Sequence, residues 1–205
     1  NSVCGIHVCC SYDNQYGTLP PDSYASVSIA DEEEACRAVT ELYRCGHRRI
    51  AALVSGTEDR SISQLRYQGY VRALAAHGLP LEQELVIEAG SFDIRQSYLA
   101  MQRRLLAGAQ FTALFAISDN MAIGAMRALR EAGRRIPEDC SVIAIDGLTV
   151  SDYINPTLTT LCQPMEHMGR RSVEILLDMV EHRGGPIRET AHTTLRTGES
   201  VRDIS

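Results

Sequence analysis

Side chains that could bind a small polar molecule gather in four short loops, each of which follows an apolar, strand-like segment. Arginine offers donors in a fixed fork, aspartate accepts from hydroxyl groups, and an aromatic ring presents a flat apolar face. The loops contain all of these groups, together with a serine hydroxyl and an amide: Arg60, Arg66, Phe92, Asp93, Ser118, Asp119, Asn120 and Asp146. This mixture predicts a site for a polyhydroxylated ligand.

The same loops lack the groups that catalysis would need. They contain no histidine, and the whole chain contains no lysine, because all 20 basic residues are arginine. A Schiff-base mechanism and the lysine of a phosphate-binding P-loop are therefore excluded. The GxSxG, HExxH and glycine-rich phosphate motifs do not occur. We predict a binding protein that is not an enzyme and uses no cofactor.

The composition is that of an ordinary globular chain. It has 205 residues, 44% of them hydrophobic and 22% charged, with a formal net charge of −6. Such an acidic chain cannot bind nucleic acid through its overall field. No apolar run approaches the length of a membrane span. The seven cysteines are irregularly spaced without a CxxC pair, which predicts free thiols in a reducing cytoplasm and no metal site.

The order of the elements predicts how the loops are positioned. Strand-like runs at residues 50–54, 85–87, 112–117 and 141–145 alternate with segments of helical periodicity, which indicates a parallel sheet covered on both faces. A further helix is expected from Glu32 to Cys45, with Asp31 as its N-cap. In a doubly wound sheet, ligands bind outside the carboxyl ends of the strands, where these loops meet.

For several loop residues the pattern leaves two interpretations. Arg66 could be a solvated helix arginine, although its position one turn into the helix favours the site, and capping explains Asp146 less well than a ligand role does. Asp119 could cap the helix that begins at Asn120 or contact the ligand. Phe92 could belong to the core or to the site, and Arg60 could be an ordinary exposed arginine.

Several stretches, in this order, resemble the lac/gal repressor family of bacterial transcription regulators. The matching segments cover about residues 26 to 180: Ser26-Val-Ser-Ile29 with Asp31, Gly46-His-Arg-Arg-Ile-Ala51, Arg66-Tyr-Gln-Gly-Tyr70, Thr112-Ala-Leu-Phe-Ala116, Ser118-Asp-Asn-Met-Ala-Ile-Gly-Ala125, Gly133-Arg-Arg-Ile-Pro-Glu-Asp139, Ser141-Val-Ile-Ala-Ile-Asp146, Pro156-Thr-Leu-Thr-Thr160 and Gln163-Pro-Met-Glu-His-Met-Gly169. Each segment alone is weakly specific, whereas the set taken together is highly specific.

The resemblance implies an α/β fold of the periplasmic-binding-protein-like type (type I), with one complete subdomain and part of a second, joined by three crossovers. Residues 1–25 would be a fragment of the amino-side subdomain and a connector. Residues 26–147 would form the carboxyl-side, effector-binding subdomain. Residues 148–183 would hold a crossover and a helix of the amino-side subdomain, and residues 184–205 would return to the carboxyl-side one.

The resemblance also assigns roles to single residues. Arg66 matches the arginine that binds the effector in the family, and Asp146 matches the aspartate on the facing loop. Phe92 stands where an aromatic ring stacks on the effector, and Arg60 stands at a second polar contact. Ser118 stands where sugar-binding members often carry asparagine.

Two further assignments come from the same resemblance. Gln163 lies at a crossover and could reach the cleft. The helix at 120–132 resembles part of a homodimer interface, with Met121, Ile123 and Met126 as its apolar positions.

These observations predict a cytoplasmic effector-binding and dimerisation module that controls operator binding when a small ligand, expected to be a sugar, changes the angle between two subdomains. Operator DNA would be bound only through a helix-turn-helix headpiece, which has no counterpart in these residues. One alternative is a periplasmic sugar-binding protein of a transport system, although seven cysteines argue against an oxidising compartment. The other is an α/β enzyme acting on a nucleotide or a sugar phosphate.

Overall fold

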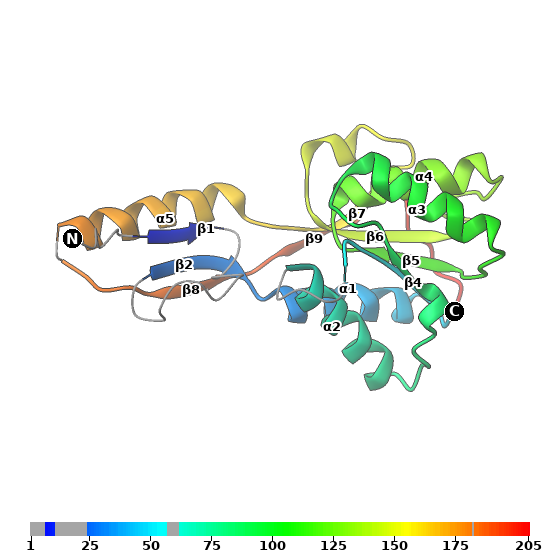
Figure 1. Cartoon of the computed structure of the whole chain (residues 1–205), viewed down its shortest axis with the longest axis horizontal. Helices are drawn as coiled ribbons and strands as arrows, with labels where there is room; N and C mark the ends of the chain where they lie inside the picture. Colours follow the sequence, from blue (N-terminus) through cyan, green and yellow to red (C-terminus); the bar gives the residue numbers. More distant parts are fainter. Residues whose placement is uncertain (1–6, 11–23, 57–61, 182) are drawn as a thin grey trace.

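The computed structural model describes residues 7–10, 24–56, 62–181 and 183–205 of the chain. These residues form two sheets, a larger one with six strands and a smaller one with three. The two sheets and their helices lie side by side along the long axis of the molecule (Figure 1). In the described part of the chain, no helix is both long and apolar enough to cross a membrane.

The six-stranded sheet is almost entirely parallel and has the order β4-β3-β5-β6-β7-β9. Only β9 runs antiparallel, against β7. Two short 3-10 helices precede β4 and follow β6, at Gln83–Leu85 (η2) and Thr149–Asp152 (η3). The strands are β3 (Ile50–Val54), β4 (Val86–Glu88), β5 (Ala113–Ala116), β6 (Ser141–Asp146), β7 (Thr159–Cys162) and β9 (Thr194–Arg196).

Helices cover both faces of this sheet, as a doubly wound fold requires. On one face lie α1 (Asp31–Arg44) and α2 (Ile62–Ala76), and on the other lie α3 (Ile94–Leu106) and α4 (Asp119–Glu131) (Figure 1). Every residue of β3 and β5 is buried, which explains why these strands read as continuous apolar runs. The predicted α/β class and its alternating strands and helices are confirmed.

A glycine allows α3 and α4 to pack closely. A Cβ atom built on Gly124 would lie 2.2 Å from the backbone oxygen of Ile94, so no larger residue fits at this crossing. Ridges and grooves of two helices approach most closely where side chains are smallest. The α3–α4 pair is thereby fixed as a unit on its face of the sheet.

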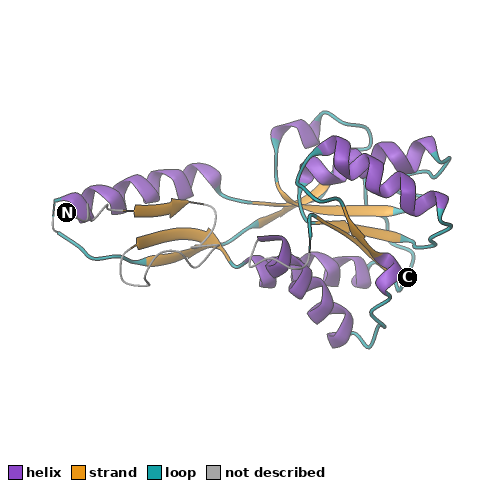
Figure 2. Ribbon diagram, viewed as in Figure 1, coloured by secondary structure: helices purple, strands orange, loops and turns teal. Residues whose placement is uncertain are grey.

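The smaller sheet has the order β1-β2-β8, and all of its strands are parallel. It is built from β1 (His7–Cys10), β2 (Tyr24–Ile29) and β8 (Arg188–Ala191). The long helix α5 (Met165–Val180) runs beside it (Figure 2). The segments of this sheet come from opposite ends of the chain.

The chain passes between the two sheets three times, as the three predicted crossovers require. The first passage leads from β2 to α1 through Ala30. The second leads from β7 to α5 through Gln163 and Pro164, and the third leads from β8 to β9 through His192 and Thr193.

The predicted subdomain boundaries need correction at these crossovers. Residues 26–29 pair with β1 and β8 in the smaller sheet, although we expected them in the larger unit. β7 belongs to the larger sheet, where it pairs with β6, and the segment after residue 184 is divided between β8 in the smaller sheet and β9 in the larger. The apolar pattern predicts a strand but not its partner, because parallel pairing joins segments far apart in sequence.

Candidate functional site

The predicted cluster of polar side chains lies at the carboxyl edge of the six-stranded sheet. Three of its members come into direct contact there: Arg66 from α2, Asp146 at the end of β6, and Gln163 in the passage from β7 to α5. Because β6 and β7 are neighbouring parallel strands, their carboxyl ends meet at the same place. Arg66 and Gln163 lie 80 and 17 positions from Asp146 in the sequence, and the sheet brings the three residues together.

Arg66 is the centre of the cluster and is almost fully buried, with 2% of its surface exposed. Its Nε donates to Oδ1 of Asp31 at 2.8 Å. Its Nη1 donates to the backbone oxygen of Ile117 at the end of β5, and to Oδ1 of Asp146 at 3.3 Å. A single guanidinium therefore joins α1, β5 and β6 at the sheet edge.

Asp31 does not have the capping role predicted for it. The N-cap position of α1 is Ala30, and Asp31 is the first helical residue. The residue is 5% exposed, and its side chain points to Arg66 rather than to a free backbone N–H group of its own helix. The adjacent glutamates Glu32, Glu33 and Glu34 complement the helix dipole, which leaves Asp31 free for this buried ion pair.

Asp146 and Gln163 form a second pair of contacts. Nε2 of Gln163 donates to Oδ1 of Asp146 at 2.8 Å, and the backbone N–H of Gln163 donates to the backbone oxygen of Asp146 at 3.0 Å. In the described structure, Oε1 of Gln163 is buried without a hydrogen-bond partner. A buried acceptor without a donor is costly, so the site contains a polar atom that a ligand hydroxyl or water could satisfy.

The backbone at Asp146 is strained, which is common at binding sites. Asp146 has a φ of 146°, a value that L-residues rarely adopt, and Gly147 follows with a φ of 77°. A Cβ atom on Gly147 would lie 2.6 Å from Cα of Cys162. Glycine is thus required after Asp146, and the turn aims the Asp146 side chain, which is 23% exposed, at the sheet edge.

Burial dominates the electrostatics of the two carboxylates. It raises the pKa of Asp31 and the pKa of Asp146 above their usual value, and in both cases the neighbouring Arg66 opposes that increase. The two carboxylates share one guanidinium, so the cluster has one more acidic group than it has cations.

Asp119 is not available to a ligand, which corrects its assignment to the site. The residue is fully buried, and its carboxylate accepts from the Leu148 backbone N–H, the Ser151 hydroxyl and the Thr160 hydroxyl, at 2.7, 2.7 and 2.6 Å. It does not cap α4 either. Instead, Asp119 fixes the loop after Asp146 to β7.

Ser118, rather than Asp119, caps α4. Its Oγ accepts from the Met121 backbone N–H at 3.3 Å, and the residue is only 3% exposed. Ser118 therefore has a structural role in place of the predicted ligand contact, since an N-cap hydroxyl satisfies a backbone donor that the helix leaves unpaired.

The contacts of the cluster do not test the other two candidates, of which one lies in the loop after β4 and the other lies outside the described part of the chain. Phe92 is 39% exposed in the loop after β4. Because β4 is three positions from β6 in the sheet, the carboxyl ends of these two strands are about 14 Å apart, and a contact of Phe92 with the ligand stays a prediction. Arg60 lies outside the described residues.

Two of the three predicted interface residues on α4 belong to the core. Met121 is 0% exposed and Met126 is 2% exposed, so neither has surface to offer a partner. The assignment was wrong for these two, because helical spacing marks an apolar face without showing what covers it. Ile123 is partly exposed and remains a prediction.

The comparisons with known proteins agree with this architecture. A family model of the periplasmic binding protein-like domain matches residues 39–201. The chain belongs to this family. Among its relatives is the HTH-type transcriptional regulator CelR of Thermobifida fusca, which is 35% identical over 185 residues, 90% of this chain and 53% of that protein.

Solved structures of lac/gal repressor family members share the fold. A structure of a CelR–cellobiose complex has a TM-score of 0.84 and 32% identity, and the match covers 95% of this chain and 58% of that one. A sugar-binding LacI-family regulator from Escherichia coli, complexed with phosphate, has a TM-score of 0.77 and 32% identity, over 87% of this chain and 63% of that one. The resemblance to the lac/gal repressor family is confirmed.

The chain spans about half the length of the curated relatives that it matches. What it shares with other lac/gal repressor family members is thus the periplasmic-binding-protein-like domain, which contains the cluster around Arg66.

Sequence reasoning missed several residues that hold the site. Asp31 is buried and bonded to Arg66, whereas Ser151 and Thr160 are buried and bonded to Asp119, which holds the loop after Asp146. Asp31 could have been found because the three glutamates that follow it already complement the helix dipole. Thr160 could have been found because it belongs to a pair of threonines in a buried strand.

Proposed function

We propose that this chain is the effector-binding module of a transcription regulator of the lac/gal repressor family, working in the cytoplasm, and that its effector is a sugar. The observation that carries the proposal is the Arg66–Asp146–Gln163 cluster at the carboxyl edge of the larger sheet. The position is where doubly wound sheets bind ligands, and the relatives described above are named as regulators.

The chemistry of the cluster suits a neutral, polyhydroxylated ligand. The partly exposed carboxylate of Asp146 can accept from two hydroxyl groups, and the unpartnered Oε1 of Gln163 can accept from a third. A negatively charged ligand would be repelled, because the cluster has two carboxylates and only one guanidinium. The solved complex of a related regulator with cellobiose supports this class of ligand.

The cluster lies where a ligand could change the angle between the two sheets. Asp31 follows the first passage between them, and Gln163 lies in the second. A ligand that binds Asp146 and Gln163 would bias the geometry of the second passage, and Arg66 would extend the effect to the first. Effector binding would thereby be coupled to operator binding through a DNA-binding segment of the regulator.

We also propose that the regulator acts as a homodimer through the surface formed by α4 and η3. Ile123 lies one turn after Asp119 on the same side of α4, and Asp119 binds Ser151 of η3. The exposed apolar residue Val150 belongs to η3, and the exposed Tyr153 directly follows it. Sedimentation equilibrium should show a dimer that Val150→Asp dissociates, whereas Val173→Asp on α5 leaves its association unchanged.

Calorimetric titration with a panel of neutral mono- and disaccharides, cellobiose included, tests the effector class. At least one sugar should bind, and Asp146→Asn should weaken that binding at least about tenfold, because charged acceptors make the stronger hydrogen bonds. The matched control is Asp178→Asn, which removes a carboxylate on α5.

The control variant should bind the sugar as the original chain does. Absence of binding by every sugar in the panel, or equal loss in the two variants, contradicts the assignment of this site.

A further inference from the structure

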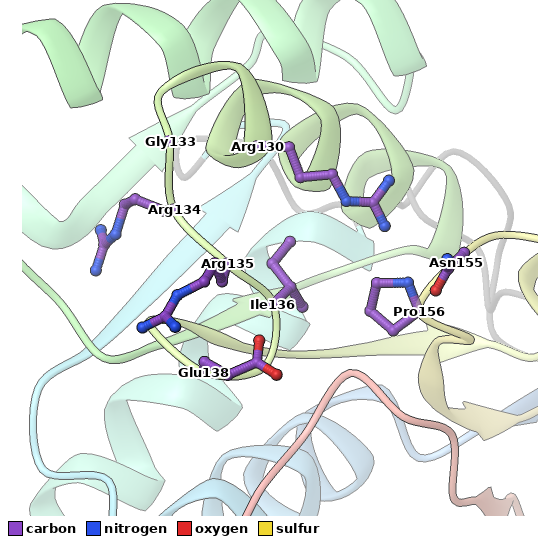
Figure 3. Close-up of a pocket in the computed structure, with 8 residues that line it drawn as sticks. All are labelled: Arg130, Gly133, Arg134, Arg135, Ile136, Glu138, Asn155 and Pro156. Atoms are coloured by element: carbon purple, nitrogen blue, oxygen red, sulfur yellow. The ribbon is translucent and has the colours of Figure 1, made fainter.

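A second hollow lies at the opposite edge of the six-stranded sheet. The segment from Gly133 to Ile136 leads from α4 toward the amino end of β6, and Asn155 and Pro156 precede β7. These two segments border a hollow of about 580 Å³, within the range of small-molecule sites (Figure 3). We call it the arginine hollow. The cluster around Arg66 lies at the carboxyl ends of the same strands, so the two places are separate.

The lining of the arginine hollow is cationic although the chain as a whole is acidic. It contains Arg130, Arg134 and Arg135 but only one carboxylate, that of Glu138. Arg135 is neutralised by Asp139, to which it donates two hydrogen bonds of 2.7 and 2.8 Å. Arg134 donates to the backbone oxygens of Phe111 and Asp139 and stacks on the Phe111 ring, so its full charge remains.

Arg130 is the cation that a ligand could bind directly. Its guanidinium extends over Pro156 toward Asn155, whereas Arg134 and Arg135 point to the other side of their segment (Figure 3). Within the described residues, the structure gives its side chain neither an ion pair nor a hydrogen bond. The nearby Glu131 cannot neutralise it, because its carboxylate already accepts from Arg127 and from the Tyr98 hydroxyl.

The remaining lining provides contacts for the rest of a ligand. Ile136 and Pro156 are buried and form an apolar floor, and the Asn155 amide and the Glu138 carboxylate can bind hydroxyl groups. The dipole of α4 favours a cation such as Arg130 in the last turn of the helix. The dipole does not explain why Arg130 and Arg134 both lack a carboxylate partner beside a hollow of ligand size.

We propose that the arginine hollow binds a small metabolite that carries a phosphate or carboxylate group on a polar body. Arg130 pairs with the anionic group, Arg134 adds positive potential, and Asn155 and Glu138 contact the hydroxyl groups of the body. This site is distinct from the cluster around Arg66 and differs from it in charge preference, so its occupation does not depend on the proposed sugar effector.

The proposal is tested by calorimetric titration of the whole chain with glucose 6-phosphate, gluconate, inorganic phosphate and glucose. Glucose 6-phosphate or gluconate should bind with one-to-one stoichiometry at moderate ionic strength, and the stronger of the two identifies the preferred anionic group. Inorganic phosphate should bind more weakly because it lacks the body. Arg130→Gln should weaken the binding at least about tenfold.

Arg103→Gln is the matched control, since Arg103 is an exposed arginine in the last turn of α3 as Arg130 is in α4. It should leave the affinity unchanged. Amide chemical shifts of Gly133, Glu138 and Asn155 should change on titration. The proposal is overturned if neither organic anion binds, if both variants lose affinity equally, or if binding is lost in Asp146→Asn instead, which would locate the anion at the other edge of the sheet.

Discussion

Nε of Arg66 and Oδ1 of Asp31 lie 2.8 Å apart, and both side chains are almost completely shielded from solvent. The pair joins the second turn of α2 to the first turn of α1, directly after the chain passes from the smaller sheet to the larger one. The same guanidinium also contacts Asp146. A residue that the sequence suggests as a ligand contact is thus also a structural centre of the fold.

Arg66→Met is expected to destabilise the chain by about 3–5 kcal/mol, because it leaves the buried Asp31 carboxylate without its counter-ion. Urea unfolding measures the loss. The control is Arg72→Met on the same helix, where an exposed pair with Glu32 at 2.8 Å should contribute less than about 1 kcal/mol. A double variant with Asp31→Asn should lose less than the sum of the single losses. Equal effects of the two arginine substitutions would refute this account.

Asp119→Ala is expected to cost about 3 kcal/mol or more, since three donors, two of them buried hydroxyl groups, lose their shared acceptor. Asp119→Asn should cost less because its amide oxygen can still accept. Hydrogen exchange at the Leu148 amide should accelerate in the alanine variant, which reports the loop itself rather than global stability. An unchanged exchange rate relative to amides in β3 would show that Asp119 does not hold the loop.

Gly147→Ala is expected to destabilise the chain by at least about 2 kcal/mol, because the positive φ disfavours a side chain and the new Cβ would meet the Cys162 backbone. It should also weaken binding at Asp146, whose orientation depends on the turn. Gly185→Ala is the control, since a Cβ there meets nothing within 4 Å. Thermal unfolding of both variants gives the comparison, and similar melting temperatures would contradict the prediction.

His47 should make stability depend on pH. The residue is 1% exposed, its Nδ1 lies 3.0 Å from the Thr112 hydroxyl, and burial lowers its pKa. The interaction of the ring with the Arg202 backbone and the negative charge of Asp203 oppose this decrease, whereas the positive charges of Arg202 and Arg48 lower the pKa further. A histidine whose pKa is lower in the folded state contributes stability that is complete above about pH 6.5 and is lost as the pH falls through and below that value.

Urea midpoints measured between pH 8 and pH 5 test this dependence. His47→Gln should lose less stability over that interval than the original chain, because glutamine takes up no proton. His167→Gln, at an exposed position on α5, is the control and should follow the original profile. Parallel profiles for His47→Gln and the original chain would exclude His47 as the source.

The sequence by itself determined the alternating strands and helices, the doubly wound class and the family. The elements and the class follow from local patterns: fully apolar strands such as Ile50–Val54 must be covered on both faces, and helical periodicity marks the helices that cover them. The family follows from the ordered set of matching segments. The sequence also placed Arg66 and Asp146 at one edge, since parallel strands share their carboxyl ends, whereas Gln163 was assigned through the family resemblance.

Only the tertiary structure decided which sheet each strand joins and which polar side chains remain available. β2 and β8 pair across more than 150 positions, a contact that no local pattern encodes. Asp119 and Asp146 lie at or just after the end of a buried strand. The Asp119 carboxylate accepts hydrogen bonds from three internal donors, whereas the Asp146 side chain stays partly exposed. The reason is physical: residue type gives a side chain its hydrogen-bonding capacity, but only packing determines which partners use that capacity.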